Sequence, residues 1–165
     1  YNSDLTKNLK RANNKNLRLT NEVSVAEFIR YFKENVSHKI TTVNEKDYLR
    51  LQKLLEVVNN KGKGKVLAVA DDMGNIVASA FLLFTKNSIS IKEANANHKG
   101  KKVCATEYLF DRIIQSYAVE KSILNFEGSS IPGVAYFNNK FGAKEFIYLR
   151  VKRNNLPMLV RAVKR

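Results

Sequence analysis

The sequence predicts an α/β (α+β) domain in which a mixed, mostly antiparallel central sheet is flanked by helices on both faces. Three observations predict this fold class. The chain has 165 residues, of which 44% are hydrophobic, which suits one compact core. Apolar residues at helical spacing alternate along it with short β-rich runs. Two nearly continuous apolar runs flank a cluster of turn residues, as is typical of adjacent strands buried on both faces.

Both ends of the chain are basic, and the first of them predicts a helix. Residues 1–18 carry a net charge of +4 and residues 150–165 a net charge of +6, out of +14 for the whole chain. We expect a basic lead-in helix over 1–16, a strand over 17–23 and a basic tail over 154–165. Such ends favour an anionic partner, such as nucleic acid, a phosphorylated cofactor or a membrane surface, or serve only as solvated ends.

Two capping boxes predict the next two helices. The Ser24-x-x-Glu27 pattern opens a stretch whose apolar residues recur at helical spacing. A second pattern, Thr42-x-x-Glu45, predicts the start of another amphipathic helix, and Gly62 lies just past its end. The first half of the domain is therefore expected to contribute a helix pair.

A three-strand meander is expected to follow the helix pair. Residues 65–86 read KVLAVADDMGNIVASAFLLFTK, two apolar runs around a turn with a glycine for positive φ. Because both runs are almost wholly apolar, they should lie centrally in the sheet. Residues 88–96, SISIKEANA, predict the third strand.

The last third of the chain alternates between helices and strands. After a polar loop at 97–102, apolar spacing predicts a helix over 103–118. A strand is expected over 122–127, a helix over 132–141 and a closing strand over 144–153. The predicted order is strand, two helices, three strands, helix, strand, helix, strand.

Cysteine and histidine content excludes several kinds of site. Cys104 is the one cysteine, and the two histidines, His38 and His98, lie far apart, so we expect no disulfide and no metal site. A reducing compartment, the cytoplasm, is the expected location. The longest apolar run, residues 76–84, is too short to span a bilayer, so no integral membrane segment is expected. The chain begins without methionine, which we interpret as a fragment of a longer protein.

This order of elements resembles the GNAT acetyltransferase superfamily over about residues 17–153. Three stretches are similar to the C-terminal GNAT-like domain of Fem-type and BioF2-like bacterial acyltransferases: 1–19, 126–143 and 151–165. The resemblance implies a single GNAT-like acyltransferase domain over 1–165, with a sheet that parts between its fourth and fifth strands to admit an acyl carrier. It also implies a partner domain, N-terminal on the same polypeptide.

The resemblance implies an N-acyltransferase that moves an acyl group from acetyl-CoA, or another acyl-CoA, to a primary amine. The Fem-type relatives imply a different donor, aminoacyl-tRNA, in cell-wall or polysaccharide biosynthesis, which would make tRNA a partner. The basic ends suit such a large polyanion. A further alternative is a non-catalytic half-domain that supports a partner domain or binds polyanions.

The expected carrier-binding residues follow from the same resemblance. The family's phosphate-binding loop, Gln/Arg-x-x-Gly-x-Gly/Ala, corresponds here to Asn97-x-x-Gly100-x-Lys102, which keeps the middle glycine. A helix start offers free N–H groups and lysines add charge, although a solvated connection fits the same pattern. At Asn138 the family often has a tyrosine that acts as general acid. We expect the carrier to contact Asn97, His98, Gly100, Lys101, Lys102, Ser129, Ser130 and Asn138.

Two carboxylates are candidates for the proton acceptor in amine acyl transfer. Glu127 ends the strand predicted over 122–127, at the edge where open α/β sheets place ligands. Glu93, on the strand predicted over 88–96, is its rival. An attacking amine must lose a proton, and either carboxylate could take it directly or through water. The alternatives are a helix cap or an ion pair for Glu127, and an edge charge for Glu93.

Overall fold

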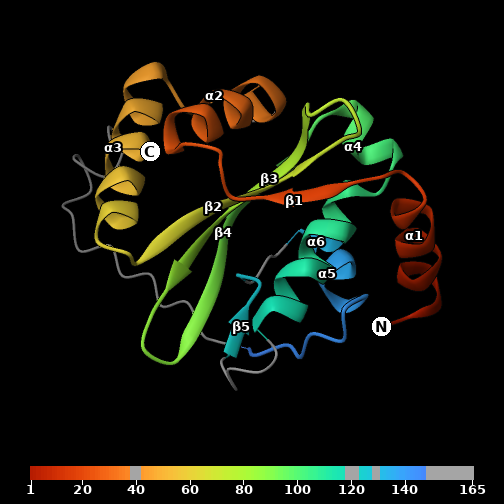
Figure 1. Cartoon of the computed structure of the whole chain (residues 1–165). Coiled ribbons are helices and arrows are strands. Elements are labelled where there is room, and N and C mark those ends of the chain that lie inside the picture. The colour runs from red at the N-terminus through yellow and green to blue at the C-terminus, as the bar shows by residue number, and fades with distance from the viewer. Residues whose placement is uncertain (38–41, 118–122, 128–130, 148–165) are drawn as a thin grey trace, which may run out of the picture.

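The computed structural model describes residues 1–37, 42–117, 123–127 and 131–147, which build one five-stranded sheet (Figure 1). The strands lie in the order β1-β2-β3-β4-β5, antiparallel up to β4, with β5 parallel to β4. Their bounds are β1 (Arg18–Thr20), β2 (Gly64–Ala70), β3 (Ile76–Phe84), β4 (Ser88–Ala96) and β5 (Ile123–Asn125). This mixed, mostly antiparallel sheet confirms the predicted fold class.

Helices cover both faces of the sheet, as predicted. α2 and α3 lie on one face, and α1, α5 and α6 on the other (Figure 1). The predicted Ser24–Glu27 capping box opens α2. Within the described ranges no helix is long and apolar enough to cross a membrane. The helices are α1 (Ser3–Asn13), α2 (Val25–Val36), α3 (Glu45–Asn60), α4 (His98–Lys102), α5 (Ala105–Tyr117) and α6 (Pro132–Asn139).

The alternation of side chains along β2 and β3 divides the interior into two cores. Val66 and Phe81 point toward α2 and α3, where Phe28 and Phe81 are fully buried with ring centroids 6.2 Å apart. Their neighbours Leu67 and Leu82 point to the opposite face and join the core under α1 and α5. β2 and β3 are thus buried on both faces, which explains their continuous apolar sequence.

The start of α3 differs from the prediction. Asn44 is the N-cap, and its side chain accepts hydrogen bonds from the N–H groups of Lys46 and Asp47. The Asp47 carboxylate in turn accepts the N–H of Asn44. The predicted box from Thr42 to Glu45 is therefore wrong by two residues. Both pairs have the spacing of a capping box, and the sequence alone does not rank them.

The predicted ends of several elements also differ. β5 stops at Asn125 because Glu127, predicted to end that strand, takes a left-handed backbone conformation with φ +55°. The closing strand predicted over 144–153 is absent from residues 144–147, and its remainder lies outside the described residues. A short helix, α4, occupies the predicted loop at 97–102.

Gly100 allows α4 to lie directly against β3. A Cβ atom at Gly100 would stand 1.9 Å from the carbonyl oxygen of Val77. Asn97 holds the contact: its Oδ1 accepts the N–H of Gly100 at 2.8 Å, and its Nδ2 donates to the carbonyl oxygen of Ile76 at 3.2 Å. The backbone of the helix thus touches the backbone of the strand, with no room for a side chain.

We expect the Gly100→Ala substitution to lower the free energy of unfolding by about 3 kcal/mol or more, because the new methyl group would overlap a backbone atom. Gly133, in α6, is the matched control, since a Cβ there meets nothing within 4 Å. Its replacement by alanine should be neutral or stabilise the protein by up to about 1 kcal/mol. Denaturant unfolding measures both values, and equal effects at the two positions would contradict this account.

Candidate active site

β4 and β5 are paired at one end and part at the other. Their parallel register runs from Ser88–Ile123 to Ser90–Asn125, after which β5 ends and β4 continues to Ala96. Over the rest of its length, this edge of β4 has no strand partner in the part of the chain that the structure describes. Backbone N–H and C=O groups on such an edge need other partners, so it can receive a ligand with amide groups.

A β-bulge lies on β4 where the two strands part. The register with β3 shifts by one residue between Ala80 and Leu82, so that Lys92 and Glu93 together stand opposite Phe81. Bulges bend a strand and change the direction of its side chains. Lys92 and Glu93 consequently both border the opening between β4 and β5.

The opening is a cleft of about 540 Å³, which we call the β4–β5 cleft. Its walls come from β4, the segment after β5, the end of α4, the first turns of α5, and α6. It is large enough for a small ligand to bind between apolar and polar walls. Its polar lining consists of Lys92, Glu93, Lys101, Thr106, Glu107, Glu127 and Asn138.

Phenylalanines form the apolar side of the cleft. Phe110 of α5 contacts Phe126, which directly follows β5, at a ring distance of 5.7 Å, and Phe137 of α6 at 5.1 Å. Phe141 packs against all three of these rings. These four residues, the phenylalanine cluster, connect the end of β5 to α5 and α6.

Both predicted catalytic carboxylates line this cleft, in different surroundings. Burial raises the pKa of Glu93, and the charge of Glu127 raises it further, while Lys92 opposes the shift. The side chain of Glu127 is 38% exposed, and its Oε1 accepts a hydrogen bond from Nζ of Lys92 at 2.9 Å. Its backbone N–H donates to Oδ1 of Asn125 at 2.9 Å, which supports the left-handed conformation. Their catalytic roles stay predictions.

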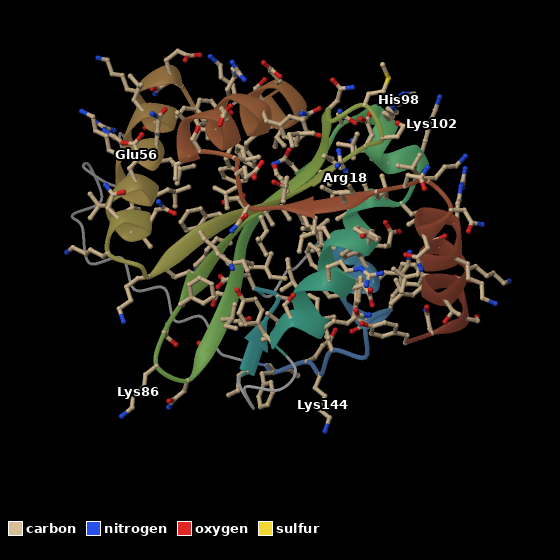
Figure 2. The ribbon with its side chains drawn as sticks, viewed as in Figure 1. Arg18, Glu56, Lys86, His98, Lys102 and Lys144 are labelled. Atoms are coloured by element: carbon tan, nitrogen blue, oxygen red, sulfur yellow. The ribbon has the colours of Figure 1, made fainter. Side chains whose placement is uncertain are left out.

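Of the predicted carrier-binding residues, some line the cleft and others do not. Lys101 and Asn138 line the cleft, while Ser129 and Ser130 lie outside the described residues. Both His98 and Lys102 are exposed on α4 (Figure 2). Four of the predicted residues do not line the cleft: Asn97, His98, Gly100 and Lys102.

Thr106 and Glu107, in the first turn of α5, line the cleft but were not among the predicted site residues. Cys104 has φ +58°, a conformation that favours glycine, and this break separates α4 from α5. The first turn of α5 therefore brings Thr106 and Glu107 to the cleft. Asn8 donates to Glu107 at 3.0 Å and Nζ of Lys140 lies 3.9 Å away, which offsets the charge of this carboxylate. Burial raises the pKa of the Cys104 thiol, which keeps it neutral.

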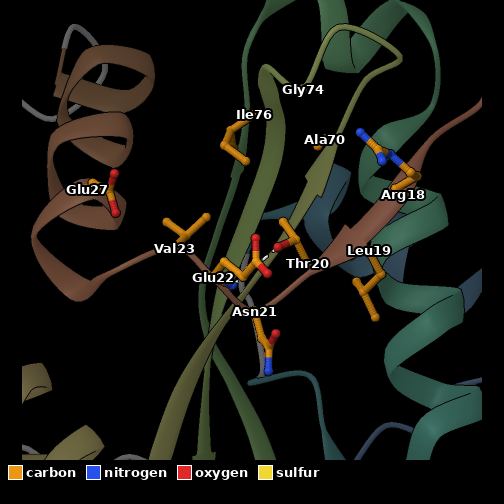
Figure 3. Close-up of a pocket in the computed structure, with 10 residues that line it drawn as sticks. All are labelled: Arg18, Leu19, Thr20, Asn21, Glu22, Val23, Glu27, Ala70, Gly74 and Ile76. Carbon is orange, nitrogen blue, oxygen red and sulfur yellow. Dashed lines mark hydrogen bonds between the residues drawn. The ribbon is translucent and has the colours of Figure 1, made fainter.

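A second cavity, of about 460 Å³, lies between β1, the start of α2 and the turn between β2 and β3 (Figure 3). None of the predicted site residues lines it. The Glu27 carboxylate in its wall is engaged in the capping box with Ser24, and the N–H of Glu22 donates to Oγ1 of Thr20. These groups serve the local structure, so the β4–β5 cleft is the better candidate.

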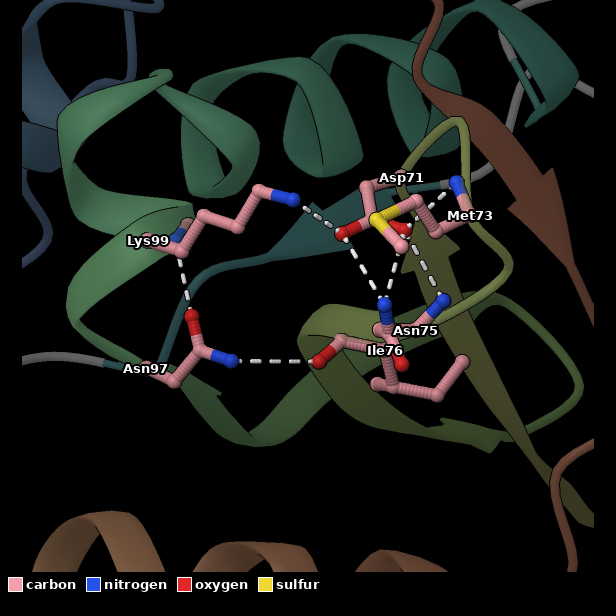
Figure 4. A network of polar contacts seen from close by, with 7 residues as sticks. Asp71, Met73, Asn75, Ile76, Asn97 and Lys99 are labelled. Atoms are coloured by element: carbon pink, nitrogen blue, oxygen red, sulfur yellow. Dashed lines mark hydrogen bonds and ion pairs between the residues drawn. The ribbon is translucent and has the colours of Figure 1, made fainter.

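Asp71 connects the β2–β3 turn to α4 (Figure 4). Its side chain is 3% exposed and accepts hydrogen bonds from Nζ of Lys99 and from the N–H groups of Met73 and Asn75. Chiefly through Lys99, these bonds lower the pKa of Asp71 to about 2. Lys99 is therefore engaged with the protein itself.

Comparison with known proteins identifies the fold. The sequence matches no protein-family model and no curated protein. A Pyrococcus furiosus protein described as an acetyl transferase has a TM-score of 0.65 at 12% identity, over 84% of this chain and 99% of its own. A predicted acetyltransferase with acetyl-CoA from Clostridium acetobutylicum has a TM-score of 0.64 at 11% identity, over 83% and 95%. The ribosomal-protein-alanine N-acetyltransferase of Brucella melitensis biovar Abortus has a TM-score of 0.57 at 14% identity, over 84% and 98%.

These neighbours are GNAT acetyltransferases, and the chain has their fold. The likeness spans most of this chain and nearly the whole of each neighbour. None of the three is described as a Fem-type transferase, so that finer resemblance stays a prediction.

The low pKa of Asp71 predicts how the Asp71→Asn variant should behave with pH. A carboxyl group whose pKa falls from 3.8 to about 2 on folding stabilises the protein above pH 4, and this contribution is lost as the pH falls through about 2. The wild type should therefore be more stable than the variant at pH 6, with the difference shrinking between about pH 4 and pH 2. Urea unfolding across this range measures it, and a pH-independent difference would contradict the assignment.

Proposed function

We propose that this chain is an N-acyltransferase that moves an acyl group from acyl-CoA to a primary amine in the β4–β5 cleft. One observation carries the proposal: the edge of β4 that has no strand partner among the described residues, the first turn of α5 and two carboxylates all border one cleft, at the point where the sheet parts. The fold shared with acetyltransferases supports the same reaction class. A supporting domain would not need an open cleft at this position.

The residues in the cleft fit an acyl-CoA. The edge of β4 beyond its described pairing with β5 offers backbone hydrogen bonds to the amide groups of the carrier's arm, and Phe110, Phe126 and Phe137 offer an apolar wall. The phosphates of the carrier can be bound by the backbone amides at the start of α5, by the Thr106 hydroxyl and by the Lys101 ammonium. When bound, acyl-CoA supplies a thioester whose carbonyl carbon can be attacked by an amine.

Glu93 is the better proton acceptor of the two carboxylates. An acceptor amine is protonated at neutral pH and must lose a proton before it attacks. A carboxylate whose pKa is raised by burial is a stronger base, and Glu93 has such a pKa. The Glu127 carboxylate is occupied by Lys92. Asn138 offers its side-chain amide as a hydrogen-bond donor within the same cleft.

Donor binding is the first prediction of this function. Thermal unfolding should shift upward with acetyl-CoA, by an amount equivalent to about 2.7 kcal/mol at one hundred times the dissociation constant. The Lys101→Glu variant should bind about tenfold more weakly or worse, since it loses one charge-assisted contact. Lys102→Glu is the matched control: the residue is adjacent and also exposed, but it does not line the cleft.

Total tRNA, tested in parallel, distinguishes the two donors. A shift with acetyl-CoA that Lys101→Glu removes and Lys102→Glu keeps supports the proposal. A shift with tRNA alone would favour the Fem-type donor, and no shift with either would count against a transferase site in this chain.

The Glu93→Gln substitution should slow acyl transfer by about 100-fold or more, the usual contribution of a general base. In the wild type, kcat/KM should rise with pH through a midpoint above 4.5, because burial raises the pKa of Glu93. Glu56→Gln is the control, since Glu56 is also half-buried but lies on α3, far from the cleft (Figure 2). Rates with a primary amine acceptor test this, and equal effects of the two substitutions would remove Glu93 from the mechanism.

A further inference from the structure

A primary amine of the protein itself already lies in the β4–β5 cleft. Lys92 stands on the β-bulge of β4, and its Nζ reaches across the opening to Glu127. Among the described residues, Lys92 and Lys101 are the lysines that line the cleft, and Lys92 is the one whose ammonium is hydrogen-bonded to a carboxylate of the lining. Its side chain is 40% exposed, so it is reachable by a ligand.

Lys92 lies within hydrogen-bond distance of a carboxylate that can take its proton. A site that activates a nucleophile has a base within hydrogen-bond distance of the nucleophile, and a third group that orients the base. Here Oε1 of Glu127 lies 2.9 Å from Nζ of Lys92. Asn125 accepts the backbone N–H of Glu127 and so helps to fix the residue that carries the base. Glu93, the neighbour of Lys92 in the bulge, is a second carboxylate in the lining of the cleft.

We propose that Lys92 is an internal acyl acceptor, so that the chain acylates its own lysine from the acyl thioester bound in the cleft. This proposal rests on the proposed function, because it uses the same donor. It assigns Glu127 as the base for Lys92, and leaves Glu93 as the base for an external amine.

The transfer step is balanced without any further reactant. Glu127 takes one proton from the Lys92 ammonium, and the freed lone pair of Nζ forms a C–N bond to the thioester carbonyl carbon. The C–S bond breaks, its electron pair goes to sulfur, and the second Nζ proton goes to that sulfur, which leaves as the free thiol. The remaining Nζ proton stays on the new amide, and Glu127 releases its proton to water.

The product would change the charge of the cleft. An amide at Lys92 is neutral and cannot form the ion pair with Glu127, so the ion pair between β4 and the segment after β5 is lost. Glu127 is then free to hold the ammonium group of an external acceptor. Self-acylation would thus change the charge of the cleft around Glu127. Lys101 and the start of α5 would stay unchanged.

Lys33 provides a matched control for the experiment. It is also a lysine paired with a glutamate, Glu45, and its side chain is 42% exposed against 40% for Lys92, but it lies on α2 outside the cleft. The purified full chain is incubated with acetyl-CoA, and the acetyl groups are located by peptide mass spectrometry over time. The variants Lys92→Arg, Lys33→Arg and Glu127→Gln are treated alike, and thermal shift by acetyl-CoA is recorded for each.

We expect one acetyl group at Lys92, at a rate that saturates with acetyl-CoA and exceeds that of Lys33 at least about tenfold. Lys92→Arg should abolish this modification and Lys33→Arg should not. Glu127→Gln should slow it by about 100-fold, as loss of a base does, while the thermal shift stays. A normal thermal shift with equal acetylation of Lys33 and Lys92, or with none at Lys92, overturns this proposal and leaves the transferase function standing. Loss of both the shift and the modification overturns both.

Discussion

The phenylalanine cluster keeps β4 and β5 apart at one end, while backbone hydrogen bonds hold them together at the other. Phe126 is the first residue past β5, and its ring packs against Phe110 and Phe141 rather than continuing along the sheet. The chain is therefore drawn toward α5 and α6 just where β4 goes on alone. The stretch of β4 that has no described strand partner, the cleft and the contact between Lys92 and Glu127 all depend on this divergence.

Local patterns allowed much of the fold to be predicted. α2 and the strands β2 and β3 follow from a capping box, from apolar spacing and from a glycine turn, signals that lie within a few residues of each element. The ends of β5 and α4 could not be predicted from such patterns, because they depend on left-handed conformations at Glu127 and Cys104. Neither residue is glycine, so the residue type at these two positions does not indicate a left-handed conformation.

The candidate site was predictable only in part, for a similar reason. Glu127 and Glu93 were predicted from their places on expected strands, whereas Lys92 gains its position from a register shift that no sequence pattern reveals. Asn97 and Gly100 have the spacing of a phosphate-binding loop, yet the Asn97 side chain bonds to Gly100 and to Ile76 of β3, and the Gly100 backbone packs against β3. A cap that packs a helix on a strand and a cap that holds an anion use the same residue types.

The separation of the two cores has a consequence for how such a chain can diverge. The core under α2 and α3 takes Val66 from β2 and Phe81 from β3, and among the described residues it shares no buried side chain with the core beside the cleft. A substitution in the α2–α3 layer reaches the cleft through the strands between them, or through the Tyr31 hydroxyl of α2, which accepts the N–H of Asn97 at the start of α4. The residues of one layer can therefore change while the other layer keeps its geometry. This is consistent with a fold shared with acetyltransferases at only 11 to 14% sequence identity.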